Sequence, residues 1–196
     1  MRLVLGLLLV LGLIVTQAVF VSGQPGLGPG AKAPDFVLPA TQGGHRQSFS
    51  LADSLKSGPV VIYFYPAAFT PGCTVEAHEF AQALDQFKAF GASVSGISAD
   101  DIDTLDKFST SECQSKFPVA SDHDLAVAKA YDAVLLKVTP KANRTSFVIA
   151  PDHTVLSVYS DLNPDHHVEK ALAALTAWQT KSQAPNPSAA PAPVAR

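Results

Sequence analysis

The chain has 196 residues, of which 47% are hydrophobic and 16% charged, and its formal net charge is -3. This length is enough for one domain with a single sizeable core. The sequence contains no basic run or patch, which argues against a nucleic-acid-binding protein.

The amino-terminal segment, residues 1–23, has the features of a secretory signal peptide. Arg2 supplies a short basic start, residues 3–15 are almost wholly apolar, and small residues precede Gln24. We therefore expect an exported protein, periplasmic or secreted, with no stable membrane association after cleavage. The alternative is an uncleaved membrane anchor, because residues 3–21 approach the roughly 20 residues that span a bilayer. Two polar residues interrupt that run, and cleavage is favoured.

Composition divides the rest of the chain into three parts. Residues 24–32 form a Gly/Pro-rich linker, and residues 33–181 carry the patterned sequence of one folded domain. Residues 182–196 are rich in Pro and Ala, a composition that cannot build a packed core, so we expect a disordered tail.

Within the domain, strand and helix patterns alternate. In chain order we expect an amino-terminal hairpin (turn 42–45, return strand 47–51), a strand 60–65, a helix 71–90, a strand 93–98, a helix from a cap at 100 or 101 to about 114, a strand 117–120, a helix 124–131, a hairpin of strands 144–150 and 154–159, and a last helix capped at 163–164. This order predicts an α/β sandwich.

One cysteine stands where chemistry is expected. The apolar run Val60 to Ile62 predicts a buried strand, the chain breaks at Pro66, and Thr70-Pro71 is a strong helix start, since Thr is a preferred N-cap and Pro a preferred first residue. Cys73 then lies in the first helical turn. Unpaired N–H groups and the positive dipole end favour a thiolate there, and a nearby cation lowers a thiol pKa further. From this signal alone, Cys73 as a small buried hydrophobe is equally acceptable.

The residues around Cys73 resemble a known signature. The stretch from Pro66 to Cys73, PAAFTPGC, looks like the Pro-x-x-x-Thr-x-x-Cys signature of the peroxiredoxins, and TPGCTVEA is similar to the Q-type, or bacterioferritin-comigratory, subfamily. The resemblance extends roughly from Gly30 to Trp178. It implies a thioredoxin-like sandwich, with a central mixed β-sheet flanked by helices and an amino-terminal hairpin.

The resemblance also implies an activity and its residues. The segment Arg144 to Ile149, RTSFVI, is similar to the family's arginine-bearing strand. The chain would be a thiol-dependent peroxidase that reduces hydrogen peroxide and organic hydroperoxides, with Cys73 as the nucleophile that becomes sulfenic acid. Arg144 and the hydroxyl of Thr70 would stabilise the developing charge. Pro66 would shield the thiolate, and Glu76 would orient Arg144.

Turnover would need a second thiol but no cofactor. Many Q-type members place the resolving cysteine five residues after the peroxidatic one, where this chain has His78. Other members place it on the next helix, and Cys113 fits that arrangement approximately. The surrounding segment 109–116 is polar, so we expect its opening to be inexpensive. A one-cysteine enzyme and a permanent Cys73–Cys113 disulfide stay open as alternatives.

The partners implied are a hydroperoxide and a thioredoxin-like or other dithiol reductant, and the Q-type resemblance favours a monomer. A thiol–disulfide oxidoreductase would need Cys-x-x-Cys, but Glu76 stands three residues after Cys73. An exported copper-binding protein would need paired cysteines with a matching histidine. The six histidines are interpreted as solvated surface residues, so no metal site is expected.

Overall fold

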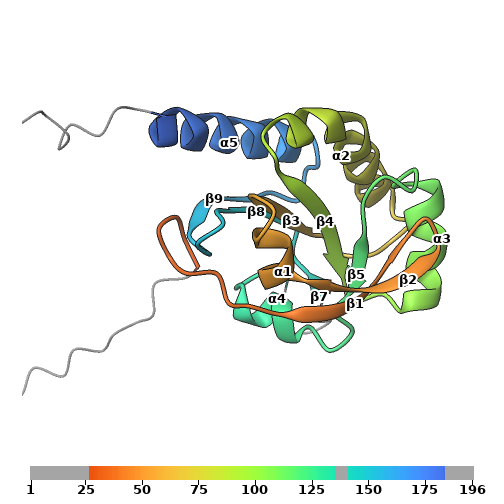
Figure 1. The fold of residues 1–196 in the computed structure, drawn as a ribbon. Coiled ribbons are helices and arrows are strands. Elements are labelled where there is room, and N and C mark those ends of the chain that lie inside the picture. Colours follow the sequence, from red (N-terminus) through yellow and green to blue (C-terminus); the bar gives the residue numbers. More distant parts are fainter. Residues whose placement is uncertain (1–26, 136–140, 184–196) are drawn as a thin grey trace, which may run out of the picture.

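The computed structural model describes residues 27–135 and 141–183 (Figure 1). The predicted signal peptide and the tail beyond residue 183 lie outside the described residues. The end of the predicted linker is bonded to the domain, because the Gly30 N–H donates to the Val155 carbonyl at 2.8 Å and Lys32 forms a β-bridge with Thr154. At the other end, the last helix continues to Gln183, two residues into the predicted tail.

The predicted alternation of strands and helices is confirmed. In the described residues the elements are β1 (Val37–Gln42), β2 (His45–Ser50), α1 (Leu51–Leu55), β3 (Val60–Phe64), α2 (Pro71–Ala89), β4 (Ser93–Ser98), α3 (Ile102–Ser111), β5 (Val119–Ser121), α4 (Ala126–Ala130), β6 (Val134–Leu135), β7 (Lys141–Ala142), β8 (Thr145–Ile149), β9 (Val155–Ser160) and α5 (His167–Gln183).

A seven-stranded mixed sheet forms the centre, with the order β2-β1-β5-β4-β3-β8-β9. Strand β3 runs parallel to β4, and β4 runs parallel to β5. The amino-terminal hairpin β1–β2 and the strands β8 and β9 add antiparallel pairs at the two sides. The carboxyl ends of β3 and β4 therefore meet at one edge of the sheet, which is where α2 begins.

Alternation along β3 builds a core on each face of the sheet. Val61, Tyr63 and Tyr65 pack with α2, α3 and α5, whereas Val60, Ile62 and Phe64 pack with α1 and α4. Figure 1 shows α2 and α5 together on one side of the sheet and α1 and α4 on the other. Because both faces of β3 are covered, all five of its residues are buried, as its apolar sequence predicts.

The structure differs from the expected elements in several places. The last helix begins at His167, after the expected cap at 163–164, and the strand expected at 117–120 is Val119–Ser121. The return strand ends at Ser50, because the Ser50 hydroxyl accepts from the Asp53 N–H at 3.1 Å and starts helix α1. Helix α3 ends at Ser111, before the expected 114, and Gln114 and Ser115 follow with left-handed φ values of 52° and 59°. The short ladder β6–β7 was not predicted, since two-residue strands carry no periodicity.

Candidate active site

Cys73 lies in the first turn of α2, as the helix-start signal predicts. Thr70 is the N-cap in an extended conformation (φ -78°, ψ 147°) and Pro71 is the first helical residue. The Cys73 side chain is only 1% exposed and lies on the edge of the core that faces α2 and α5. A buried thiol at a helix start has backbone N–H groups beside it and little water to compete for them.

The loop before the helix is held in an unusual conformation. Phe69 has φ 60°, a left-handed value that costs a non-glycine residue roughly 1–3 kcal/mol. The Asp100 carboxylate accepts from the Ala68 N–H at 2.7 Å and from the Ser98 hydroxyl at 2.8 Å. The sequence predicted the helix cap at Asp100 or Asp101, and the cap is Asp101. Asp100 instead ties the end of β4 to this loop.

The Thr70 hydroxyl is oriented differently from the prediction. It donates to the Ala67 carbonyl at 3.0 Å and makes no capping bond to the first turn. Its hydrogen is therefore engaged, and its oxygen is left to accept. Pro66 is half-buried where the chain leaves β3, four residues before Thr70.

The structure brings Arg144 to the thiol, 71 residues away in sequence. Arg144 Nη2 donates to Cys73 Sγ at 3.4 Å, and Nε donates to the Leu162 carbonyl at 2.9 Å. The side chain is 5% exposed. Gly72 makes room for the guanidinium, since a Cβ there would lie 3.1 Å from Arg144 Nη2.

Glu76 holds the other end of the guanidinium. Arg144 Nη1 donates to Glu76 Oε2, and the Glu76 side chain is fully buried. Burial raises the pKa of Glu76 to about 8, and the opposing influence of Arg144 only partly offsets that rise. The geometry therefore orders Glu76, Arg144 and Cys73 as a continuous buried chain of contacts.

Cys113 is buried two residues beyond the end of α3, in the same apolar cluster as Cys73. Both cysteines are free thiols. Burial raises the pKa of Cys113 well above its usual range, so this thiol is unreactive where it stands.

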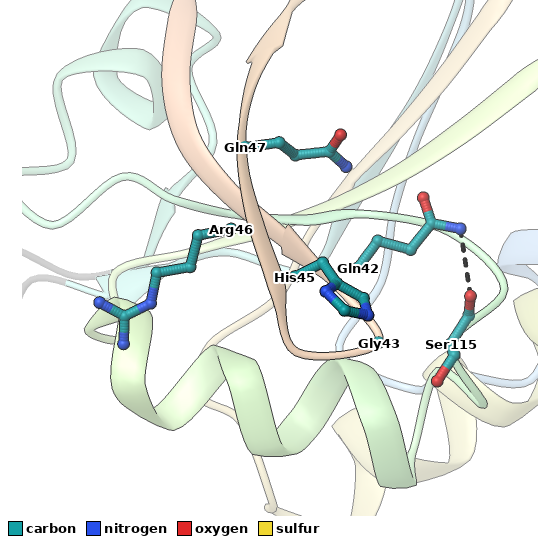
Figure 2. A pocket seen from close by; sticks show the side chains of 6 residues that line it. All are labelled: Gln42, Gly43, His45, Arg46, Gln47 and Ser115. Atoms are coloured by element: carbon teal, nitrogen blue, oxygen red, sulfur yellow. Dashed lines mark hydrogen bonds between the residues drawn. The ribbon is translucent and has the colours of Figure 1, made fainter.

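The segment around Cys113 is tied down more firmly than its polar sequence predicted. The amino-terminal hairpin closes on it, with Gln42 Nε2 donating to the Ser115 carbonyl at 3.1 Å (Figure 2). Gly44 N–H donates to the Ser109 hydroxyl at 3.1 Å. The hollow of about 440 Å³ at this turn is lined by none of the predicted site residues. Opening the segment has to break these hydrogen bonds, and its expected low cost stays a prediction.

One histidine was also placed wrongly. His167 is fully buried at the start of α5, whereas its neighbour His166 is exposed and pairs with Glu169. Adjacent helical residues point about 100° apart, so one of the two faces the sheet. No group of three or more His, Cys, Asp or Glu side chains could hold a metal ion within residues 27–135 and 141–183. None of the described helices is long and apolar enough to cross a membrane.

Comparison with known proteins identifies the family. Residues 29–158 match the AhpC/TSA family. A relative from Mycobacterium tuberculosis is 40% identical over 152 residues, covering 76% of this chain and 96% of its own length. Peroxiredoxin Bcp from Escherichia coli (strain K12) is 32% identical over 145 residues, covering 71% and 90%. The crystal structure of peroxidoxin BcpB from Mycobacterium tuberculosis superposes with a TM-score of 0.70 at 37% identity, covering 77% and 97%.

These similarities agree with the geometry around Cys73. They do not favour the metal-binding or thiol–disulfide exchange alternatives. The chain therefore belongs to the AhpC/TSA family as a peroxiredoxin of the Q, or Bcp, type, and it is a thiol-dependent peroxidase.

Proposed function

We propose that Cys73 is the peroxidatic nucleophile and that Arg144, Thr70, Glu76 and Pro66 form its site. The observation that carries this proposal is the 3.4 Å contact between Arg144 Nη2 and Cys73 Sγ in the first turn of a helix. A fixed cation and the helix N-terminus both stabilise a thiolate. Arginine also presents several donors in one plane, so it can bind sulfur and a peroxide oxygen together.

The reaction is a displacement at oxygen. The Cys73 thiolate attacks the terminal oxygen of a hydroperoxide, the S–O bond forms, and the O–O bond breaks. Sulfur becomes sulfenic acid, and the departing oxygen takes a proton and leaves as water or an alcohol. Arg144 stabilises the charge that develops on the two oxygens. Because the Thr70 hydrogen is engaged with Ala67, the Thr70 oxygen accepts the peroxide O–H.

Glu76 and Pro66 do not contact the peroxide in this proposal; they orient Arg144 and shield the thiolate. Glu76 fixes the plane of the guanidinium through Nη1, leaving Nη2 for sulfur. Pro66 is half-buried in the loop before Cys73, and we assign it the role of shielding the thiolate, since its ring is apolar and its nitrogen has no hydrogen to bind water.

In this proposal Cys113 resolves the sulfenic acid. Its thiol attacks Cys73, water leaves, and a disulfide forms, which a thioredoxin-like or other dithiol then reduces. Because Cys113 is buried, the segment that carries it has to leave its place first. The enzyme is exported after cleavage behind residue 23. It works as a monomer, which sedimentation of the purified protein tests.

The assignment is tested by thiol counting and intact mass after one equivalent of hydrogen peroxide. Cys73→Ser should abolish peroxide consumption while the protein keeps its fold, and Cys113→Ser is the matched control that should keep the first reaction. Substantial peroxidase activity in Cys73→Ser, with any reductant, would remove Cys73 from this role.

A further inference from the structure

Behind Arg144, the chain of buried contacts continues to His167. Glu76 uses Oε2 for Arg144, while its other oxygen, Oε1, is buried without a hydrogen-bond partner among the described residues. That oxygen lies 3.5 Å from His167 Nδ1, and both side chains are fully buried. A buried carboxylate oxygen with no partner is costly, so this contact needs an explanation.

The other contacts of His167 fix where its proton is. His167 Nε2 lies 3.0 Å from the Asp161 carbonyl, which can only accept, so Nε2 carries a hydrogen. In a neutral ring Nδ1 then holds a lone pair. Ser146 Oγ lies 2.8 Å from Nδ1, and it donates to that lone pair or, when Nδ1 is protonated, accepts from it. An unprotonated Nδ1 and an ionised Oε1 only 3.5 Å apart are both electron-rich and repel each other, and one proton held by the pair lowers that repulsion.

We propose that Glu76 and His167 hold a single proton between Oε1 and Nδ1, and that His167 is thereby a positioning residue for the peroxidatic site. Burial lowers the pKa of His167 and raises that of Glu76 to about 8, which places the proton on Glu76 at neutral pH. Glu76 then accepts from Arg144 through Oε2 and donates towards His167 through Oε1.

The protonation state of Glu76 determines how strongly the positive charge of Arg144 stabilises the Cys73 thiolate. A neutral Glu76 still orients the guanidinium, but it does not cancel its charge. An ionised Glu76 would place a negative charge beside Arg144 and repel the thiolate, in a site where little water screens the interaction. As the pH rises through about 8, the pair loses its proton and Glu76 changes from neutral to ionised.

Other charged and titratable groups face the pair from each packed element. Tyr159 stacks edge-on against the His167 ring at 4.8 Å. The remaining groups that act on Glu76, His167 or both are Arg144, Tyr63, Glu79, Asp161 and His166. Among them, only Arg144 forms a direct hydrogen bond to the Glu76 carboxyl group. Glu79, Asp161 and His166 are more exposed and are screened by solvent.

The proton can be counted without any peroxide, so this test is independent of the proposed role of Cys73. Infrared spectra of the reduced protein near neutral pH, with Glu76→Gln as reference, report a protonated carboxyl group. Nitrogen NMR of labelled histidine reports the His167 ring, with the signal assigned by its loss in His167→Gln and its retention in His166→Gln. We expect one proton in the pair. Finding none, with ionised Glu76 and neutral His167, or finding two, would overturn the proposal.

The kinetic test follows the peroxide reaction against pH. The wild-type rate should fall on the alkaline side as the pair loses its proton, and Glu76→Gln, which stays neutral at every pH, should show no such fall. His167→Gln keeps a donor near Asp161 but cannot titrate, so the alkaline fall should move by about 1 pH unit or more. The exposed His166→Gln is the matched control. If His167 has only a structural role, His167→Gln should lower the rate by the same factor at every pH and leave the alkaline fall at the same pH as in His166→Gln. That result would also overturn the proposal.

Discussion

His78 Nε2 lies 3.0 Å from Glu112 Oε2, which joins the helix that carries Cys73 to the residue preceding Cys113. A second tie runs in the same direction, because Lys116 Nζ donates to the Ala81 carbonyl at 2.9 Å. Together with the hairpin contact of Gln42, these bonds hold the Cys113 segment from both sides. Resolution of a Cys73 sulfenic acid therefore requires several bonds to break at once.

The first prediction concerns Cys113. In the wild type, one equivalent of peroxide should consume both thiols and give an intramolecular disulfide, after opening that brings the two Cα atoms within roughly 7 Å. Cys113→Ser should react once and stop as sulfenic acid, which excess peroxide drives to the sulfinic form. Mass spectrometry distinguishes these products. A wild-type protein that stops at sulfenic acid, with Cys113 still titratable, would be a one-cysteine enzyme.

The second prediction concerns the shape of the Arg144 side chain. Arg144→Lys keeps the charge but loses the planar fork that contacts Cys73, Glu76 and the Leu162 carbonyl. The second-order rate with peroxide should fall on the order of 100-fold, the cost of losing one charge-stabilising donor. Stopped-flow kinetics measures it, and the half-exposed Arg46→Lys is the control. Equal rates for the two variants would show that the guanidinium does not position the oxygens.

The third prediction concerns Gly72. A methyl group at this position would meet Arg144 Nη2 at 3.1 Å, so Gly72→Ala should push the guanidinium a few tenths of an ångström from the thiol. We expect the peroxide rate to fall on the order of 10-fold, since small displacements of catalytic groups are costly. The melting temperature should not fall, because alanine favours a helix over glycine. An unchanged rate would mean that Arg144 tolerates displacement.

The fourth prediction concerns export. Mature protein recovered from its native host should begin near Gln24 and be found outside the cytoplasm, because residues 1–23 have the pattern of a signal peptide. Amino-terminal sequencing of the fractionated protein measures this. Recovery of a chain that retains Met1 in the membrane fraction would support the anchor instead.

The sequence by itself determined the features that arise from residues close together in the chain, such as helix starts and buried strands. Thr70-Pro71 starts the helix wherever it packs, so Cys73 had to lie in a first turn. The apolar run of β3 required a strand covered on both faces. The Arg144 role came from resemblance, and the sequence alone would not have distinguished it from an exposed arginine at the start of a strand.

Only the tertiary structure decided which distant groups meet. The antiparallel pairing of β8 with β3 and the close approach at Gly72 bring Arg144 to Cys73 across 71 residues. His166 and His167 are identical in type and adjacent, and only the packing of α5 against the sheet buries the second beside Glu76. The sequence of the segment around Cys113 is polar and does not indicate how it is held, because its hydrogen-bond partners, Gln42 and Ala81, come from other elements. Burial and pairing are properties of the packed chain, and no local pattern encodes them.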